Sequence, residues 1–326
     1  MVPRPPPVFP SHGENPHRSR RTGQPSPAGP VNQGRLPQSL TLNRRKNVHN
    51  LRLLGHAESA MHVVITGSTK GIGLGMAREF LKRGHDVVVS SRGAVAVDRI
   101  VADLSADFPG RTVVGKACDV AVYDQVQALW AAAVVSLGSV DIWVNNAGRD
   151  GAKMPFFMIP PDDYVKTINT NLIGMMNCNR VAIPGMYKQG TGMIWNMEGF
   201  GSNGDVRPAL SPYGTTKYGL RYFTKALIQE LAKTPVKVGY LSPGIVITDM
   251  TVPPPEQRGK NWERSKKIYN ILADTVETVT PWLVDGMLRE HGRHGAAVRW
   301  LTPAKVQRRF LMNIFRKRNL LDQLGY

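Results

Sequence analysis

The sequence predicts a single α/β domain built around a doubly wound parallel sheet, and three observations support this fold class. From residue 61 onward, short β-branched runs alternate with amphipathic stretches of helical length. A glycine-rich loop follows the first of these runs. The chain of 326 residues, 42% of them apolar, is also long enough to bury one large core. Such alternation implies right-handed crossovers and a sheet covered on both faces, with ligands at the carboxyl ends of its strands.

The strands and helices of this sheet can be placed in order along the chain. The expected strands are short runs rich in Val and Ile, and the expected helices carry apolar residues at helical spacing. The strands are 62–66, 86–91, 111–117, 140–145, 192–197 and 236–243. The helices that follow the first five are 71–83, 94–107, 121–137, 162–188 and 212–233.

The alternation changes after the sixth strand. Residues 249–285 contain VPPPEQRGKNWERSKK and then a helical stretch, and an insertion at this edge of the sheet is where a lid would form. Residues 296–302 read AAVRWLT and can supply a seventh strand. Apolar residues over 306–315 then recur at near-helical spacing among Lys and Arg residues. We therefore expect one domain over 61–303 and a basic helix and tail over 304–326.

Residues 1–60 have the composition of a disordered segment. They hold ten of the 24 prolines and show no recurring apolar period. Their excess of Arg over acidic residues fits a plastid or mitochondrial transit peptide, which would favour the plastid stroma or thylakoid surface. The alternative is that translation starts at Met61, directly before the first strand, in a cytoplasmic protein. No apolar run approaches the roughly 18 residues that a membrane span needs.

The formal net charge of +18 is concentrated at the two ends of the chain. Residues 1–60 carry nine Lys/Arg against two acids, residues 286–326 also carry nine against two, and the part between is nearly neutral. No aromatic residues alternate with these cations to form a stacking platform, so we expect no nucleic-acid partner. The basic amphipathic C-terminal stretch could instead rest on an anionic membrane surface, or bury its apolar face against its own domain or a second subunit.

The cysteines and histidines do not predict a metal site. Cys118 and Cys178 lack CxxC or metal-type spacing, which excludes a disulfide framework and favours a reducing compartment. His291 and His294 form the one close histidine pair, in a glycine-rich basic turn that fits a solvated loop. We therefore expect no bound metal ion.

The loop TGSTKGIG (66–73) follows the first strand and opens the first helix. Glycines let the backbone approach a pyrophosphate closely, and the helix N-terminus supplies unpaired N–H groups and a favourable dipole. The position that would hold an acid for the adenosine ribose of NAD reads Ser90-Ser91-Arg92. Because Arg92 and Lys70 would attract a 2′-phosphate that an acid would repel, we expect the cofactor to be NADP(H). The alternative makes both residues ordinary surface cations.

Tyr213 and Lys217 stand at positions i and i+4 of the expected helix 212–233, so they share one face. A phenol with a pKa of about 10 transfers protons poorly at neutral pH unless a nearby cation lowers that pKa, which Lys217 can do. Tyr213 could then protonate a carbonyl oxygen while NADPH delivers hydride to the carbon. The alternative is a surface tyrosine that lies beside a lysine by chance. Chance is improbable, because the glycine loop (66–73) and an NNAG motif (145–148) precede the pair in the order typical of such enzymes.

These motifs together resemble the short-chain dehydrogenase/reductase family from residue 61 to about 249. The matching parts are the TGxxxGxG loop, the NNAG, the YxxxK pair and the asparagine of NLxG, here Asn171. The resemblance implies that Asn171 holds Lys217 through a water molecule, that SPG and Thr248 border the nicotinamide, and that the protein forms a dimer or tetramer. The expected cofactor site lies at the carboxyl edge of the sheet. It comprises Gly67, Ser68, Thr69, Lys70, Gly71, Ile72, Gly73, Arg92, Asp119, Asn145, Ala147, Gly148, Pro243, Gly244 and Thr248.

One catalytic side chain of that family is missing from its usual place. Most members carry paired serines directly after the fifth strand, but this chain has Glu198 and Gly199 there. Ser202 lies on the same loop, eleven residues before Tyr213, and is the candidate for the displaced hydroxyl. The catalytic set that we expect is therefore Tyr213, Lys217, Asn171 and Ser202.

The role of Glu198 stays open at this point. A neutral Glu198 in a desolvated site could donate a hydrogen bond. An ionised Glu198 could pair with Arg207 or Lys153 and serve the structure only.

Several segments are similar to those of one branch of the family, the chlorophyll b reductases. They are N-x-(D/E)-G-x-G-S-x-G, YGxTK and LSPGxVxTD, and the ending RWLTPAKVQRRF extends the likeness over nearly all of 61–320. The resemblance implies an NADPH-dependent reductase of a bulky, largely apolar carbonyl compound, in its sharpest form the C7 formyl group of chlorophyll b. The alternatives are a different bulky aldehyde or ketone, or an NADP(H)-binding protein that has lost catalysis.

Overall fold

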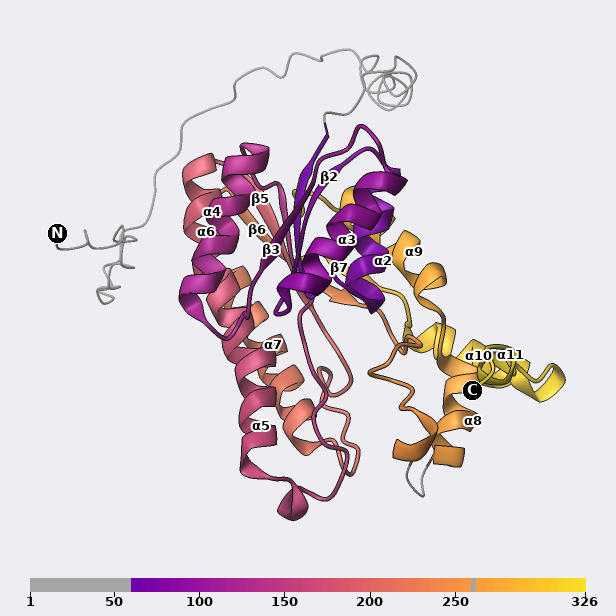
Figure 1. Ribbon diagram of the computed structural model, residues 1–326. Coiled ribbons are helices and arrows are strands. Elements are labelled where there is room, and N and C mark those ends of the chain that lie inside the picture. The colour runs from indigo at the N-terminus through magenta and orange to yellow at the C-terminus, as the bar shows by residue number, and fades with distance from the viewer. Residues whose placement is uncertain (1–59, 259–261) are drawn as a thin grey trace, which may run out of the picture. The chain divides into compact units, whose positions relative to one another are not determined.

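The computed structural model describes residues 60–258 and 262–326. Its centre is a seven-stranded sheet in the order β3-β2-β1-β4-β5-β6-β7 (Figure 1). All six neighbouring pairs are parallel, which confirms the doubly wound fold class and the seventh strand. The strands are β1 (His62–Thr66), β2 (Asp86–Ser91), β3 (Val113–Ala117), β4 (Ile142–Asn145), β5 (Gly192–Met197), β6 (Val236–Ser242) and β7 (Ala297–Arg299).

Helices connect successive strands, and they cover both faces of the sheet. The longer ones are α2 (Gly71–Lys82), α3 (Ala94–Asp107), α4 (Tyr123–Leu137), α6 (Gly174–Gln189), α7 (Ser211–Glu230) and α9 (Val276–Arg289). Figure 1 shows α2, α3 and α9 on one side of the sheet and α4, α6 and α7 on the other. The short elements η2 (Phe156–Met158) and α5 (Pro161–Ile168) lie between β4 and α6.

Two apolar clusters, one on each face, hold the sheet and helices together. Successive residues of β1 point to opposite faces of the sheet: Val63 and Ile65 belong to one cluster, and Val64 belongs to the other. The first cluster adds Trp195 and side chains of α2, α3 and α9, and the second adds Trp143 and side chains of α4 and α6. Because every strand of the centre is buried on both faces, its loops at the carboxyl edge rest on a rigid base.

The expected helix 162–188 is interrupted in the structure. A π-helical turn, η3 (Asn169–Ile173), separates α5 from α6. Single π turns inside helices are frequent at functional sites because they re-aim one side chain. Here the turn contains Asn171, whose side chain is buried.

The segment after β6 departs from strand–helix alternation, as expected. It contains η4 (Pro255–Gln257) and α8 (Trp262–Leu272), and after β7 the chain continues with α10 (Pro303–Phe315) and α11 (Leu320–Gln323). The buried Asp274 joins these parts, because its carboxylate pairs with Arg309 at 2.9 Å and Arg318 at 2.7 Å and accepts a hydrogen bond from Trp300 Nε1 at 2.6 Å. The C-terminal helices thus brace the segment between β6 and α9.

Replacing Asp274 by Asn is expected to lower the free energy of unfolding by about 2–4 kcal/mol, because two guanidinium groups lose a buried counter-charge. Urea denaturation measures the loss. Asp322→Asn is the matched control: its carboxylate pairs with Lys266 but is half exposed, so a loss below about 1 kcal/mol is expected. Equal losses for the two variants would contradict the bracing role of Asp274.

Candidate active site

The glycine loop and the NNAG segment meet at the carboxyl edge of the sheet. Asn146 donates from its side chain to the carbonyl oxygens of Thr66 and Gly67, both at 2.9 Å. The Thr66 hydroxyl in turn accepts hydrogen bonds from the backbone N–H groups of Asn146 and Ala147. Gly67 has φ +65°, and a Cβ there would lie 2.8 Å from the Ala147 Cα. Asn146 belongs to the NNAG motif (145–148), but the expected cofactor site did not include it.

The loop forms a cradle that a side chain would fill. A Cβ on Gly73 would overlap the Gly67 carbonyl oxygen, so the helix start can only be this tight with glycine at that position. The first turn of α2 has no acidic residue, and Lys70, its N-cap residue, makes no side-chain cap. The N-terminus of α2 therefore keeps the positive end of its dipole open toward the sheet edge, which fits a pyrophosphate.

Two of the expected cofactor residues, Ser68 and Asn145, use their side chains for hydrogen bonds within the protein. The Ser68 hydroxyl donates to Ile65 O at 2.6 Å and accepts from Ser90 N at 2.9 Å, and it is fully buried. The Asn145 amide accepts from Trp143 Nε1 and donates to Asn196, both at 2.8 Å. Their side-chain hydrogen bonds are thus directed into the protein, and contact of Ser68 and Asn145 with the cofactor stays a prediction.

The remaining cofactor candidates lie around the same edge. Arg92 is exposed just after β2, and Asp119 follows β3, where its carboxylate accepts from Ala121 N at 3.0 Å. Lys70 forms an exposed ion pair with Asp249 at 2.9 Å. The segment after β6 reaches the glycine loop, because a Cβ on Gly71 would lie 3.4 Å from Cγ2 of Thr248.

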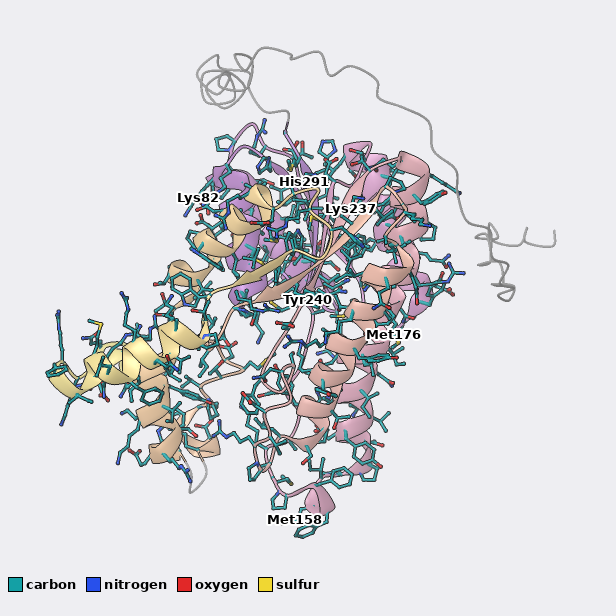
Figure 2. The ribbon with its side chains drawn as sticks, turned by 180° about the vertical axis from the view of Figure 1, so that it is seen from behind. Lys82, Met158, Met176, Lys237, Tyr240 and His291 are labelled. Carbon is teal, nitrogen blue, oxygen red and sulfur yellow. The ribbon has the colours of Figure 1, made fainter. Side chains whose placement is uncertain are left out.

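The loop of Pro243 and Gly244 turns the chain at the end of β6. Gly244 has φ +72°, and a Cβ there would come within 2.6 Å of the Leu301 side chain. Figure 2 shows β6 from behind, running from Lys237 toward Tyr240, so its carboxyl end points toward the loops that reach Met158. The expected nicotinamide border therefore lies at the same edge as the glycine loop.

Tyr213 and Lys217 project from the first turns of α7. The Lys217 Nζ lies 5.8 Å from the centre of the Tyr213 ring and donates a hydrogen bond to Met197 O at 3.2 Å. Burial lowers the pKa of Lys217 to about 8, against the opposing effect of Glu198. The amino group of Lys217 lies at the end of β5, and above neutral pH it is only partly protonated.

The pKa of Tyr213 does not behave as the sequence led us to expect. Burial raises it above its usual value, and the carboxylate of Asp150 raises it further. The expected lowering by Lys217 is wrong for the protein alone, because Lys217 is itself desolvated and directs its Nζ at Met197 O. Tyr213 is therefore protonated throughout the neutral range in the protein alone, and it can give up this proton only where a nearby positive charge stabilises its phenolate.

Asn171 is tied directly to the loop after β4. Its amide donates to Arg149 O at 2.8 Å and to Thr216 Oγ1 at 3.1 Å, and its Oδ1 accepts from Arg149 N at 2.8 Å. A Cβ on Gly148 would lie 3.4 Å from Asn171 Oδ1 and 3.9 Å from Lys217 Nζ. Asn171 and Lys217 thus flank the same glycine, and a water between them stays a prediction.

Gly199 occupies the place beside Tyr213. A Cβ there would overlap the Tyr213 hydroxyl oxygen and lie 3.0 Å from Lys217 Cε. Ser202 is buried, and its hydroxyl oxygen accepts a hydrogen bond from Gly199 N at 3.0 Å. The loop therefore brings the Ser202 hydroxyl to the residue that Tyr213 touches, and its O–H proton remains available for a further bond.

Glu198 has partners other than the two that we considered. Its carboxylate lies 3.6 Å from Arg221 Nε and 3.6 Å from Arg299 Nε. Arg207 instead donates to Ser265 Oγ, and Lys153 pairs with Asp150. The pairing with Arg207 or Lys153 is therefore wrong. No sequence signal joins Glu198 to Arg221 on α7 or Arg299 on β7, because the sheet alone brings these segments together.

Neither a metal centre nor a membrane span is found in the described parts of the chain. Among residues 60–258 and 262–326, no three His, Cys, Asp or Glu side chains gather in a way that could hold a metal ion. Over the same ranges, no helix is long and apolar enough to cross a membrane.

Comparison with known proteins adds to this geometry. The family model "short chain dehydrogenase" matches residues 61–259. The "Probable chlorophyll(ide) b reductase NYC1, chloroplastic" of Arabidopsis thaliana is 36% identical over 81% of this chain and 55% of its own length, so the chain spans about half of that relative. The "Chlorophyll(ide) b reductase NOL, chloroplastic" of the same plant is 37% identical over 76% of this chain and 72% of its own length.

Among solved structures, the crystal structure of a variant actinorhodin polyketide ketoreductase with NADPH has a TM-score of 0.66 and 27% identity. It covers 76% of this chain, which covers 97% of that one. A gluconate 5-dehydrogenase from Burkholderia cenocepacia, in complex with NADP and tartrate, has a TM-score of 0.63 and 25% identity, with 74% and 93% coverage.

Proposed function

The chain belongs to the short-chain dehydrogenase family, and on that premise we propose that it is an NADPH-dependent carbonyl reductase. One observation carries this proposal: the hydroxyl of Tyr213, still protonated and backed by Lys217, lies at the same sheet edge as the glycine cradle. A general acid beside a dinucleotide site is the arrangement that carbonyl reduction requires.

We propose NADP(H) as the cofactor because its second phosphate has cationic partners here. Lys70 and Arg92 lie at the start of α2 and just after β2, and the first turn of α2 carries no acidic residue to repel an anion. Both solved relatives described above were crystallised with NADPH or NADP. When bound, the nicotinamide would supply the hydride.

The side chains of this chain would then orient the carbonyl and move one proton. The Tyr213 O–H would donate its proton to the carbonyl oxygen of the substrate. The Ser202 O–H, fixed through Gly199 N, donates a second hydrogen bond to the same oxygen. Lys217, in its ammonium form, stabilises the negative charge that develops on the Tyr213 oxygen. Asn171 keeps the loop of Gly148 in register with Lys217.

The rate of carbonyl reduction is expected to fall as the pH rises through about 8, the pKa of Lys217. Below that pH the ammonium is present; above it the charge is lost, while Tyr213 keeps its proton because its pKa is raised. Initial rates of NADPH oxidation from pH 6 to 10 at constant ionic strength measure this. In Lys217→Arg, whose cation does not titrate in this range, any residual activity should lose the alkaline limb. A wild-type rate that stays flat to pH 10 would contradict this role for Lys217.

For the substrate we propose a bulky, largely apolar aldehyde, in its sharpest form the formyl group of chlorophyll(ide) b. Similarity to the two plant reductases over 76–81% of this chain supports the pigment. The runner-up is a different bulky aldehyde or ketone, which the 27% identity to a polyketide ketoreductase favours. An inactive NADP(H)-binding protein is disfavoured, because Tyr213, Lys217 and Asn171 converge in one buried site.

The test is NADPH oxidation by the purified full chain with chlorophyllide b, and in parallel with a panel of simple aldehydes and ketones. Turnover of the pigment supports both the activity and the substrate. Turnover of simple carbonyls alone supports the runner-up. Cofactor binding without turnover of any carbonyl would overturn the proposed activity.

We also propose that α10 rests on an anionic membrane surface. Its outward face carries large apolar side chains, with Ile314 75% and Phe315 84% exposed, and Phe310 and Leu311 are also exposed. No acidic residue occurs from 291 to 321, whereas Arg308, Arg316 and Lys317 stand within two residues of these apolar side chains in the sequence. Apolar anchors flanked by cations match an anionic lipid surface. A plastid location would fit this and the chloroplastic relatives; the expected transit peptide lies outside the described residues.

Flotation of the full chain with phosphatidylglycerol vesicles, against phosphatidylcholine vesicles, tests this surface. Binding to the anionic vesicles should fall at least about tenfold in Phe315→Glu. Val135→Glu is the matched control, because Val135 is equally exposed, at 86%, but lies on α4, which carries no Lys or Arg. If Phe315→Glu changes only the oligomeric state, the face covers a second copy and the membrane proposal fails. Homo-oligomers are common among members of this family, so light scattering must accompany the flotation.

A further inference from the structure

Glu198 is a buried acid that has no role in the proposed reaction. It follows β5 directly and is 4% exposed. Arg221 and Arg299 flank its carboxylate from α7 and β7, each at 3.6 Å. These distances allow charge attraction without a hydrogen bond, and within the described residues Oε1 accepts none. A buried carboxylate with an unsatisfied oxygen is costly, so a compensating role is expected at this position.

The backbone around Glu198 touches both members of the Tyr213–Lys217 pair. The carbonyl before it, on Met197, accepts the hydrogen bond from Lys217 Nζ at 3.2 Å. The residue after it, Gly199, lies against the Tyr213 hydroxyl so closely that a Cβ would overlap it. The Glu198 N–H itself donates to Leu241 O at 2.7 Å, which extends the pairing of β5 with β6 by one residue. Movement of Glu198 would therefore move the supports of Tyr213 and Lys217 together.

We propose that Glu198 is a positioning residue for the Tyr213–Lys217 pair: held between Arg221 and Arg299, its carboxylate fixes the turn under both side chains and keeps Lys217 in its ammonium form. This inference deepens the proposed function and rests on it only where turnover is measured.

The charges around Lys217 support this assignment. Burial lowers the pKa of Lys217 to about 8, and Glu198 is the group that acts in the opposite direction. From the loop after β4, Asp150 raises the pKa of Tyr213 and is itself paired with Lys153. No other acid opposes the desolvation of Lys217 in the described residues, so loss of the Glu198 charge should discharge it at lower pH.

On the β6 side, Tyr240 completes the surroundings of Glu198. Its ring lies 6.0 Å from the Arg299 guanidinium, and Figure 2 shows it near the carboxyl end of β6. Burial and then Glu198 raise the pKa of Tyr240, whereas Arg221 and Arg299 lower it. Tyr240 therefore stays neutral at the pH where Lys217 titrates, and the charge seen by Lys217 is set by Glu198 and its two arginines.

The first test needs no substrate. In the full chain labelled with ¹³Cε-lysine, the signal of Lys217, assigned by its loss in Lys217→Met, is followed from pH 6 to 10. Glu198→Gln should lower the midpoint by about half to one pH unit. Arg299→Gln should raise it, because one compensating charge of Glu198 is gone. Glu230→Gln is the control: it removes the same charge from an exposed position on α7 and should leave the midpoint unchanged.

Opposite shifts in Glu198→Gln and Arg299→Gln support the inference, since a purely structural ion cluster would lower stability in both variants without moving the titration in opposite directions. An unchanged midpoint in either folded variant overturns it. Arg299 is 40% exposed and its variant should fold even if Glu198→Gln does not. The alkaline limb of the rate profile should shift with the midpoint. If the Lys217 titration shifts as expected but no carbonyl compound is turned over, the proposed function is wrong and this inference is still supported.

Discussion

Tyr213→Phe is expected to slow carbonyl reduction about a thousandfold while leaving cofactor binding intact. The change removes the Tyr213 hydroxyl, which lies against Gly199 beside Lys217, and keeps the half-buried ring. General acid catalysis contributes about 10²–10⁴ to the rate, so kcat should fall by roughly 10³. NADPH oxidation measures the rate, and quenching of intrinsic fluorescence by NADPH measures binding, which should change less than about threefold because Tyr213 lies beyond the glycine cradle.

Tyr218→Phe is the matched control for that variant. Tyr218 lies on the same helix but is 60% exposed, so loss of its hydroxyl should leave kcat within about twofold. If Tyr213→Phe kept a tenth or more of the wild-type rate, the proton would have to come from a different group, and the proposed mechanism would be wrong.

Gly199→Ser, which restores a serine where most of the family has one, is expected to inactivate the protein. The new Cβ would overlap the Tyr213 hydroxyl and press on Lys217 Cε at 3.0 Å, so the pair must shift. Displacing a reacting group by about 1 Å costs on the order of 10²-fold in rate, and a loss of at least that size in kcat is expected. Circular dichroism should show a retained fold, because Gly199 lies in a loop and not in a core cluster.

Gly219→Ala controls for adding a methyl group near this helix. A Cβ there meets Leu172 at 3.7 Å, an ordinary contact, so activity should be unchanged and stability equal or slightly higher. Ser202→Ala completes the set: if Ser202 is the displaced hydroxyl, kcat should drop about tenfold to a hundredfold. A Gly199→Ser variant that is as active as wild type would show that Tyr213 does not work from this position.

The sheet could be predicted well from the sequence because its strands are short β-branched runs that alternate with helices. The same local rules missed the π turn between α5 and α6, because apolar spacing predicts that a helix is present but not which carbonyl oxygen each N–H group bonds. That turn matters because it directs Asn171 at Arg149 and Thr216. The prediction of one continuous helix over 162–188 therefore did not include this turn.

The candidate active site also has a part that could be predicted from the sequence and a part that could not. Tyr213 and Lys217 were predictable because both lie on one helix, four residues apart. The partners of Glu198 were not, because Arg221 and Arg299 reach it from a helix and a strand that are distant in sequence. The raised pKa of Tyr213 was also missed, since it depends on how deeply the pair is buried. Spacing indicates which groups can meet, and packing decides their charge.

The central claim is that hydride goes to a carbonyl carbon while Tyr213 supplies the proton, and one labelling experiment tests it most directly. The full chain is incubated with chlorophyllide b and NADPH that carries two deuterium atoms at C4 of the nicotinamide, and the pigment is analysed by mass spectrometry. We predict one deuterium on the new hydroxymethyl carbon with wild type, and labelled product at about a thousandth of that rate with Tyr213→Phe. Oxidation of the cofactor without deuterium in any carbonyl product, or labelled product at the wild-type rate from Tyr213→Phe, would contradict the account.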